Sequence, residues 1–354
     1  MQREKILFGL ILIGLIACEK ERTPIQNPGS KKTIEWLIDA ADVLDGGPGK
    51  DGIPALENPE MIEAFEADYL SLEDLVIGYK YGDEVRAYPH KILDYHEIAN
   101  DDIDDNLFAI TYCPLTGTAT NWNRRVEGLI TTFGVSGLLF NSNLMPYDRG
   151  TESLWSQMRL DCVNGTLLGS NIPVFHTVET TWHSWKKMYP NTKVMSTNTG
   201  YNRNYEVYPY SNGSQDYREV DFLVFPVKNI DNRLHTKERV LGLINNEDSR
   251  AYRFELFTEG ISVVEDVVGG EKVAIIGSKD DNFMIAFFVD DQILEPLGKL
   301  KDGFVKDQNE NIYDPFGYII SGPNMGERLK PTNAYIGYWF SWPAFYPDIE
   351  IFGE

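Results

Sequence analysis

Hydrophobic residues in this chain fall into short runs separated by turn residues. FAITY, LITTFGV and LWSQM between residues 108 and 158, and VAIIG and FMIAFFV between 273 and 289, are typical of these runs. Each has the length and the β-branched or aromatic content of a strand, and no long amphipathic helical pattern alternates with them. The pattern therefore predicts a mainly β fold, an α+β chain with short helices, rather than a doubly wound parallel sheet.

Two stretches of the pattern occur twice, in the same order. VIGYKYGDEVRAY at 76–88 aligns without a gap on VLGLINNEDSRAY at 240–252, and each string is typical of two short strands joined by a polar turn. WHSWKKMYP at 182–190 aligns in the same way on WFSWPAFYP at 339–347, with aromatic residues at helical spacing before a proline. Two matches at similar separation indicate an internal duplication. We expect two related β-barrel or β-sandwich repeats packed together.

The segment boundaries follow from these matches. We expect a first β-rich repeat over 33–195, a tyrosine-rich connector over 196–238 and a second β-rich repeat over 239–354. A signal segment over 1–17 and a polar tether over 18–32, rich in charged residues with Pro and Gly, precede them. The roughly 320 residues after the tether exceed one typical core, which agrees with two units.

The first residues predict export and attachment to a membrane. A basic start is followed by an apolar run at 6–17, which is too short for a stable membrane-spanning helix and is typical of a signal peptide. The run ends in Leu-Ile-Ala before Cys18, which resembles the bacterial lipobox; this resemblance implies cleavage before Cys18 and its lipidation. Glu19 favours the outer membrane, by analogy with lipoprotein sorting. We expect a cell-envelope protein anchored to the lipid bilayer through acylated Cys18; an ordinary signal peptide or an anchor helix is the alternative.

The charge of the chain excludes one class of partner. Its 32 Lys and Arg stand against 54 Asp and Glu, a formal net charge of −22. Loss of residues 1–17, in which Arg3, Lys5 and Glu4 sum to +1, leaves −23. Phosphate backbones repel such a surface, so we expect no nucleic-acid partner.

The candidate chemistry lies in the first repeat. Cys113, one of three cysteines, ends an apolar run, and a short helix expected over 89–100 carries His96 near its apolar face, with Glu97 beside it. In the second repeat Ser278 aligns with Cys113, and Gly260-Ile261 falls near the His96-Glu97 pair. We therefore expect the chemistry in the first copy alone, with the second as structural support.

Several roles remain open for these residues. Cys113 and His96 together could form a thiolate–imidazolium pair, oriented by Glu97 or Asp94, or could bind a metal ion, copper first and zinc second. Cys113 could equally form a disulfide with Cys162 in an oxidising compartment. His96 could simply be a hydrogen-bonded core residue.

A second group of candidates follows the strand that ends near residue 148. Asp148, Arg149, Glu152 and Gln157 could hydrogen-bond a ligand, or could tie together the hairpin whose turn is Asp-Arg-Gly-Thr. The structural role is favoured.

The ordered strings VIG…RAYPHKIL…HEIAND, ITYCPLTGTA, TFGVSGLLFNSNL, YDRGTESLWSQ and TTWHSWKKMYPNT resemble the bacterial family catalogued as domain of unknown function 3179. The likeness runs from about Asp51 to the C-terminus. It implies an exported or lipid-anchored protein with a duplicated, mostly β fold, and no settled activity. Related sequences commonly carry a second cysteine where this chain has Thr116, which weakens a two-thiolate clamp or redox pair here.

The sequence thus supports three functions of different classes. The leading one is a lipoprotein that binds copper or zinc, or does thiol chemistry, at Cys113 and His96. The alternative is a non-catalytic envelope module that binds a glycan, peptide or protein through exposed tyrosines of the connector. A third is a hydrolase or transferase with Cys113 as nucleophile and His96 as base.

Overall fold

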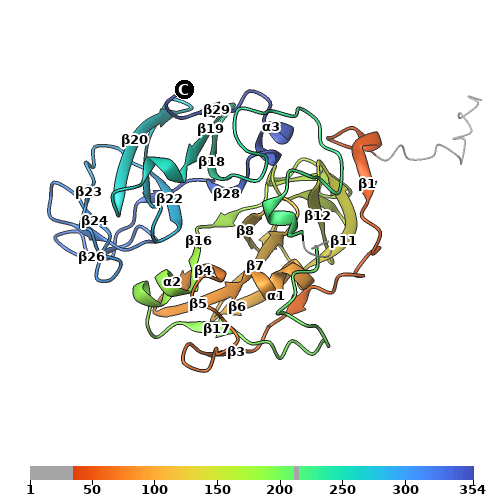
Figure 1. The fold of residues 1–354 in the computed structure, drawn as a ribbon, viewed down its shortest axis with the longest axis horizontal. Coiled ribbons are helices and arrows are strands. Elements are labelled where there is room, and N and C mark those ends of the chain that lie inside the picture. Colours follow the sequence, from red (N-terminus) through yellow and green to blue (C-terminus); the bar gives the residue numbers. More distant parts are fainter. Residues whose placement is uncertain (1–34, 211–214) are drawn as a thin grey trace, which may run out of the picture. The chain divides into compact units, whose positions relative to one another are not determined.

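Strands are the main regular secondary structure in the computed structural model, which describes residues 35–210 and 215–354 (Figure 1). The signal segment, Cys18 and the tether expected above lie outside the described residues. None of the helices within the described ranges is long and apolar enough to cross a membrane. The mainly β fold predicted from the hydrophobic runs is confirmed.

The matched strings form two sheets with the same strand order. The order in the first copy is β16 (Val178–Thr181), β4 (Leu75–Tyr81), β5 (Glu84–Pro89), β17 (Lys193–Met195) and β3 (Met61–Glu63). The order in the second copy is β28 (Tyr335–Tyr338), β18 (Arg239–Asn245), β19 (Asp248–Arg253) and β29 (Glu350–Ile351). In both, the central hairpin is antiparallel and the strand after the hairpin's second strand is parallel to it. We call these two sheets the hairpin sheets.

Each hairpin sheet is followed by a helix whose tryptophan ring packs directly against a glycine of the hairpin. Helix α2 (Trp182–Met188) follows β16 and helix α3 (Ser341–Phe345) follows β28. A Cβ atom on Gly78 would lie 2.1 Å from the Trp185 ring, and one on Gly242 would lie 2.2 Å from the Trp342 ring. The repeated glycine and the repeated tryptophan are therefore one packing contact, made twice.

The repeated RAY string has a similar explanation. In each copy an arginine and a tyrosine of the hairpin bind one aspartate of a neighbouring strand at 2.6–2.7 Å, which gives an arginine, a charged acceptor and a phenol in one buried network. The two sets are Arg86, Tyr88 and Asp101 in the first copy, and Arg250, Tyr252 and Asp266 in the second. We call them the RAY–Asp triads.

A second sheet also recurs. In the first copy its order is β15 (Val174–Phe175), β8 (Thr118–Asn123), β7 (Asn106–Cys113), β6 (Ile98–Ile103) and β2 (Leu56–Glu57). In the second copy it is β20 (Ser262–Val268), β21 (Glu271–Ser278), β22 (Phe283–Phe288) and β27 (Lys330–Pro331). Cys113 and Ser278 both end the central strand, as the alignment of the two copies predicts. Three antiparallel strands are common to both sheets, β6 to β8 in the first copy and β20 to β22 in the second, and we therefore call them the three-strand sheets.

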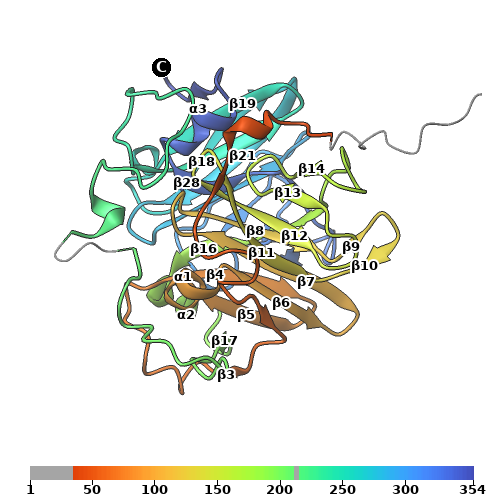
Figure 2. The same cartoon turned by 90° about the vertical axis from the view of Figure 1, so that its right-hand side faces the viewer.

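The remaining strands are additions to one copy or the other. In the first copy β1 (Val43–Asp45), β11 (Phe133–Phe140), β12 (Asn143–Asp148), β13 (Leu154–Ser156) and β14 (Asp161–Asn164) form a sheet, and β9 (Arg125–Val126) pairs with β10 (Leu129–Ile130). In the second copy β23 (Glu295–Pro296), β24 (Val305–Lys306), β25 (Ile312–Tyr313) and β26 (Ile319–Ser321) form another. The first of these sheets packs through β11 on β6 (Figure 2). Each strand order in the described residues runs between two edges, so the architecture is sandwich-like rather than barrel-like.

The two copies share their hydrophobic cores. One face of each hairpin sheet packs on the three-strand sheet of its own copy, with Ile77 on Phe108 and Ile110 in the first and Leu241 on Ile275 in the second. The other face packs on the opposite copy: Val76, Trp182 and Trp185 join Ile276 and Phe283, while Val240, Trp339 and Trp342 join Ala109 and Trp122. The repeats are therefore interlocked, which is why residues 35–354 form one compact unit.

The copies differ most in the segment after the hairpin. The first copy has helix α1 (His90–His96), and the second has only the 3-10 turn η3 (Phe254–Leu256). The helix is shorter than the expected span 89–100, because Glu97 takes a positive φ of 58° and Ile98 begins β6. Two further 3-10 turns are η1 (Ala40–Asp42) and η2 (Tyr217–Glu219), the latter in the connector.

Candidate functional site

His96 is a buried structural residue in this fold. Its side chain is fully buried, and both ring nitrogens have partners: Nδ1–H donates to the Pro54 carbonyl at 2.8 Å, and Nε2 accepts from the Tyr205 hydroxyl at 2.7 Å. Burial lowers the pKa of His96, so the ring is held neutral in one tautomer. The imidazole has no free nitrogen for Cys113 or for a metal ion in this arrangement.

Cys113 is also sealed from solvent. Its thiol is 1 % exposed and lies 3.7 Å from the Ser142 carbonyl, and burial, with the Glu97 carboxylate nearby, raises its pKa to about 11. Cys113 and Cys162 are both free and buried in the structure, which therefore holds no disulfide between them. No group of three or more His, Cys, Asp or Glu side chains placed to hold a metal occurs within the described residues.

The Glu97 side chain lies near the Cys113 thiol and makes no hydrogen bond to the neighbouring His96 ring. Its carboxylate accepts a hydrogen bond from the Tyr210 hydroxyl at 3.2 Å, and burial raises its pKa to about 7. The structure thus brings Glu97 and Cys113 together and keeps His96 engaged elsewhere. A neutral thiol next to a carboxyl group is not an activated nucleophile.

Asp148 and Gln157 serve the local sheet. Asp148 accepts hydrogen bonds from Thr151, through both its backbone and its hydroxyl, and from the Trp155 indole. Gln157 lies in the core, where its amide oxygen accepts from Thr118 and Asn143, each at 2.7 Å. Both side chains hold strands together and are separate from each other, so no ligand-binding cluster forms here.

Arg149 and Glu152 lie at the surface of the same hairpin. Arg149 pairs with Asp51 at 3.0 Å and with Glu57 at 2.7 Å, which ties the N-terminal segment to the sheet. Glu152 contacts Lys50, and both are well exposed. Of these four residues, Asp148 ties the hairpin itself, while Arg149 and Glu152 contact the N-terminal segment and Gln157 bonds within the core.

The tyrosines of the connector pack on the first repeat. Tyr205 binds His96, Tyr210 binds Glu97, and the Tyr217 hydroxyl donates to the Leu115 carbonyl at 3.0 Å. Tyr208 reaches the neighbouring Pro114 carbonyl. These rings cover the segment around Cys113, and only Tyr201 among the described connector tyrosines is a large exposed ring.

A different set of polar groups meets where the two copies join. Strand β16 of the first copy packs on β22 of the second, and β28 of the second packs on β8 of the first (Figure 1). Between these contacts lies a cavity of about 280 Å³, which we call the inter-repeat pocket. Its principal polar lining residues are His90, Asp94, Tyr112, Glu179, Arg218, Arg239, Asn282 and Tyr338.

Helix α1 places two titratable groups in this pocket. His90 and Asp94 are four residues apart and therefore lie on one face of the helix, which starts at His90 because Pro89 ends β5 in an extended conformation. Nε2 of His90 and Oδ1 of Asp94 are buried and have no hydrogen-bond partner among the described residues. Burial lowers the pKa of His90 and raises that of Asp94, so both groups are held in their neutral forms.

Two guanidinium groups flank these neutral groups. Arg239, the first residue of β18, donates to Glu179 and to Asn282, each at 2.6 Å. Arg218, in the connector turn η2, forms a two-point pair with Asp216. Both guanidinium groups lower the pKa of His90 in addition to burial, and the Glu179 carboxylate lies 3.9 Å from Nε2 of the same ring.

Aromatic rings complete the walls. The His90 ring lies 4.3 Å from the Tyr112 ring, centre to centre. The Tyr338 ring is so close to Gly117 that a Cβ there would lie 2.8 Å from it, and Gly117 also needs its positive φ of 61°. Buried groups with perturbed pKa values, aimed into a cavity at a junction of units, are the usual mark of a functional site.

A known protein family matches most of the chain. The profile of the family described as "Protein of unknown function (DUF3179)" matches residues 50–349. The chain belongs to this family. No curated protein and no solved structure matches the chain. Every lining residue of the inter-repeat pocket lies within the part of the chain that matches the DUF3179 profile.

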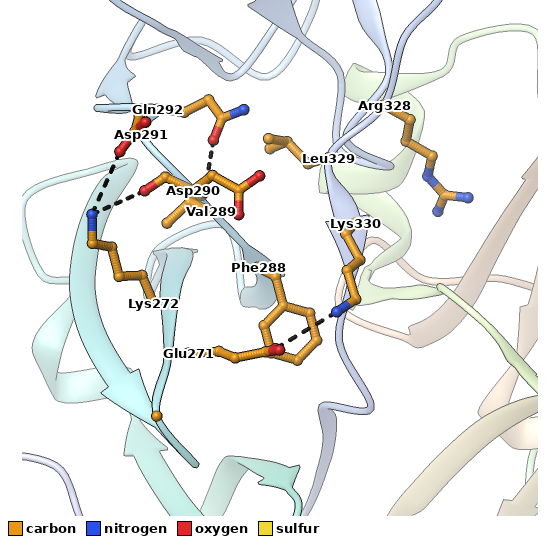
Figure 3. Close-up of a pocket in the computed structure, with 11 residues that line it drawn as sticks. Glu271, Lys272, Phe288, Val289, Asp290, Asp291, Gln292, Arg328, Leu329 and Lys330 are labelled. Carbon is orange, nitrogen blue, oxygen red and sulfur yellow. Dashed lines mark hydrogen bonds and ion pairs between the residues drawn. The ribbon is translucent and has the colours of Figure 1, made fainter.

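A second pocket on the second repeat has a different character. Figure 3 shows Glu271, Lys272, Asp290, Asp291 and Lys330 around an open hollow near β27. Glu271 pairs with Lys330 at 3.6 Å, and Lys272 donates to the Asp290 carbonyl at 3.0 Å. These are exposed surface pairs, and surface ion pairs contribute little energy or specificity. The inter-repeat pocket is the stronger candidate in this member of the DUF3179 family.

Cys113 and His96 stood out in the sequence as candidate site residues, whereas the residues of the inter-repeat pocket did not. One local signal was present: His90 and Asp94 stand at i and i+4 on the expected helix, which places them on one face. Glu179 and Arg239 carry no such signal, because each is a single charged residue in a strand distant in the chain. The second copy also lines the pocket, since Arg239, Asn282 and Tyr338 come from it.

Proposed function

We propose that this chain is a lipid-anchored protein of the cell envelope that binds a small polar molecule in the inter-repeat pocket. Two atoms support the assignment most strongly, Nε2 of His90 and Oδ1 of Asp94. Both are buried at the wall of a cavity, and no described residue satisfies their hydrogen-bonding capacity. A buried polar atom without a partner costs stability, so a folded chain that keeps two of them in one cavity is suited to a ligand that supplies the missing partners.

The size and walls of the pocket set the class of ligand. A cavity of about 280 Å³ is near the lower limit of small-molecule sites. Its lining carries paired charges, two phenols and two neutral titratable groups, and therefore suits a compact polar molecule better than a lipid tail or a folded partner.

The other functions considered have less support. A copper or zinc ion, or a reactive thiolate, at Cys113 and His96 does not fit residues whose sulfur is protonated and whose ring nitrogens are both bound. A module that binds a glycan or peptide through the connector would need exposed tyrosines, and most of the described connector tyrosines pack on the first repeat instead.

The pocket is tested with purified full-length protein in detergent. We expect some members of a panel of small polar metabolites to raise the melting temperature of the wild type, because a ligand bound only by the folded state stabilises it. His90→Phe should reduce the shift; phenylalanine stands at the equivalent position 254 in the second copy, so the ring is compatible with this frame. His183→Phe, on α2 outside the pocket, should keep it. Equal shifts in all three proteins would overturn the assignment.

The anchor is tested separately. Wild-type cells should incorporate labelled palmitate into the protein and retain it in the membrane fraction, because two or more acyl chains bind a bilayer stably. Cys18→Ala should lose the label. Labelling that persists in Cys18→Ala would refute acylation at this cysteine.

A further inference from the structure

We infer that the inter-repeat pocket takes a small carboxylate anion and that His90 gains a proton as the anion binds. This inference rests on the proposed function and adds the charge of the ligand and the proton that accompanies it. It is carried by the arrangement of donors and charges around the cavity.

The buried formal charges in the pocket wall are already paired, and Glu73, a further lining carboxylate, is exposed to solvent. Arg239 has Glu179 as its partner at 2.6 Å, Arg218 has Asp216 at 2.9 Å, and Lys91 has Asp74 at 2.9 Å. The two groups without partners, His90 and Asp94, are both in the neutral form. Among the described lining residues, the pocket therefore holds no buried, unpaired negative charge that would attract a cation.

Several groups in the pocket wall can donate hydrogen bonds. A protonated Asp94 presents an O–H, and the hydroxyls of Tyr112 and Tyr338 belong to side chains that line the cavity. Burial raises the pKa of both phenols, so each keeps its proton. A carboxylate offers two acceptor oxygens and no donor, which complements such a wall, and bonds to a charged acceptor are stronger than neutral ones.

The electrostatic surroundings of His90 favour the same ligand. From β18 and the connector, Arg239 and Arg218 lower its pKa; from β16, Glu179 lies 3.9 Å from Nε2 and is shared with Arg239. Tyr112 of β7 lies against the ring, and Asp94 on the same helix is uncharged. A small anion in the cavity can contact the guanidinium groups of Arg218 and Arg239, which both line it, although the whole chain carries a net charge of −22.

Anion and proton binding are then coupled. An anion beside His90 favours the imidazolium, so the pKa of His90 rises in the complex and one proton is taken up from solvent. Asp94 responds in the same direction, because a nearby anion further disfavours its ionised form and preserves its O–H donor. No covalent step is involved.

The test is isothermal titration of the full-length protein in detergent with formate, acetate and lactate, at pH 5.5, 6.5 and 7.5 and constant ionic strength set by chloride. We expect binding at pH 5.5 that weakens by about tenfold per pH unit once the solution pH exceeds the pKa of free His90. Titration in two buffers of different ionisation enthalpy should report uptake of one proton.

Variants separate the parts of the site. His90→Phe should abolish the proton uptake and flatten the pH dependence, and Arg218→Gln should weaken binding at every pH while keeping the proton uptake. His183→Phe should behave as wild type, which controls for a histidine elsewhere. Arg218 lies at a turn of the connector, so this variant keeps the experiment informative if His90→Phe does not fold.

The outcomes distinguish the two proposals. Binding of neutral or cationic metabolites without binding of any of the three carboxylates would overturn the anion inference and leave the proposed function standing. Carboxylate binding without proton uptake, or uptake that persists in His90→Phe, would overturn the role of His90. Absence of any ligand in both this titration and the metabolite panel would overturn both.

Discussion

The two repeats of this chain keep the same frame and differ in what they place at their junction. Both contain a hairpin sheet with the same strand order, a RAY–Asp triad, and a glycine that admits a tryptophan ring. After the hairpin, the first copy adds two turns of helix with His90 and Asp94, whereas the second has a short turn that begins with Phe254. The shared hairpin sheets depend on packing contacts that occur in both copies. The polar groups of the pocket depend in part on helix α1, which only the first copy has.

The inter-repeat pocket shows this difference at pairs of equivalent positions. Each pair takes one lining residue from each copy, and in each pair the two residues differ in polarity, size or conformational freedom. The pairs are Leu75 and Arg239, Thr181 and Tyr338, and Gly117 and Asn282. Two identical copies would build a symmetric junction. Divergence at these positions gives the wall from the second copy a cation and a phenol, and helix α1 gives the wall from the first copy His90 and Asp94.

The largest effect is expected from the RAY–Asp triads. Asp101→Ala should lower the free energy of unfolding by about 3–5 kcal/mol, because it leaves the buried Tyr88 hydroxyl without its acceptor and the largely buried Arg86 with Glu84 as its remaining partner. Asp266→Ala should cost less, about 2 kcal/mol, because Arg250 is more exposed and can be hydrated. Urea denaturation measures both.

The same measurement tests the interlocked cores. Because each hairpin sheet packs on the opposite copy, both substitutions should shift one common unfolding transition. Two transitions, each sensitive to only one substitution, would show that the copies fold as independent units.

A smaller effect, with a pH dependence, is expected at Glu97, near whose aligned position the second copy has Ile261. Its folded-state pKa of about 7 exceeds the ordinary 4.5, so the folded protein holds a proton that the unfolded chain releases. Stability is therefore lost as pH rises from 4.5 to 7, by about 3 kcal/mol in all. Glu97→Gln should recover most of this loss at pH 8 and change little at pH 4; an equal effect at both values would contradict the assignment.

The smallest effect is expected at Cys113, which aligns with Ser278. Cys113→Ser should cost about 1 kcal/mol, because a hydroxyl can donate to the Ser142 carbonyl in place of the thiol. Ligand-induced thermal shifts should be unchanged. Loss of these shifts in a folded Cys113→Ser protein would indicate that the ligand binds at Cys113 rather than in the inter-repeat pocket.

Much of the fold was predictable because its signals are local. The strings at 76–88 and 240–252 predict hairpins, since alternation, turn residues and β-branched side chains act within a few residues. The alignment also placed Cys113 opposite Ser278, and both end the central strand. The helix expected over 89–100 was too long, because the backbone turn at Glu97 and the pairing of Ile98 with Thr111 depend on β7, which apolar periodicity does not report.

The site was less predictable because its parts are distant in sequence. His96 looked chemically available on the expected helix, and only the approach of Pro54 and Tyr205 shows that its ring is engaged. The sequence by itself determined the duplicated, mainly β frame, since short-range patterns set strands and turns. Only the tertiary structure decided that His90, Glu179 and Arg239 share one cavity, because each copy lays its hairpin sheet on the other, and the groups at that junction meet through packing rather than through chain proximity.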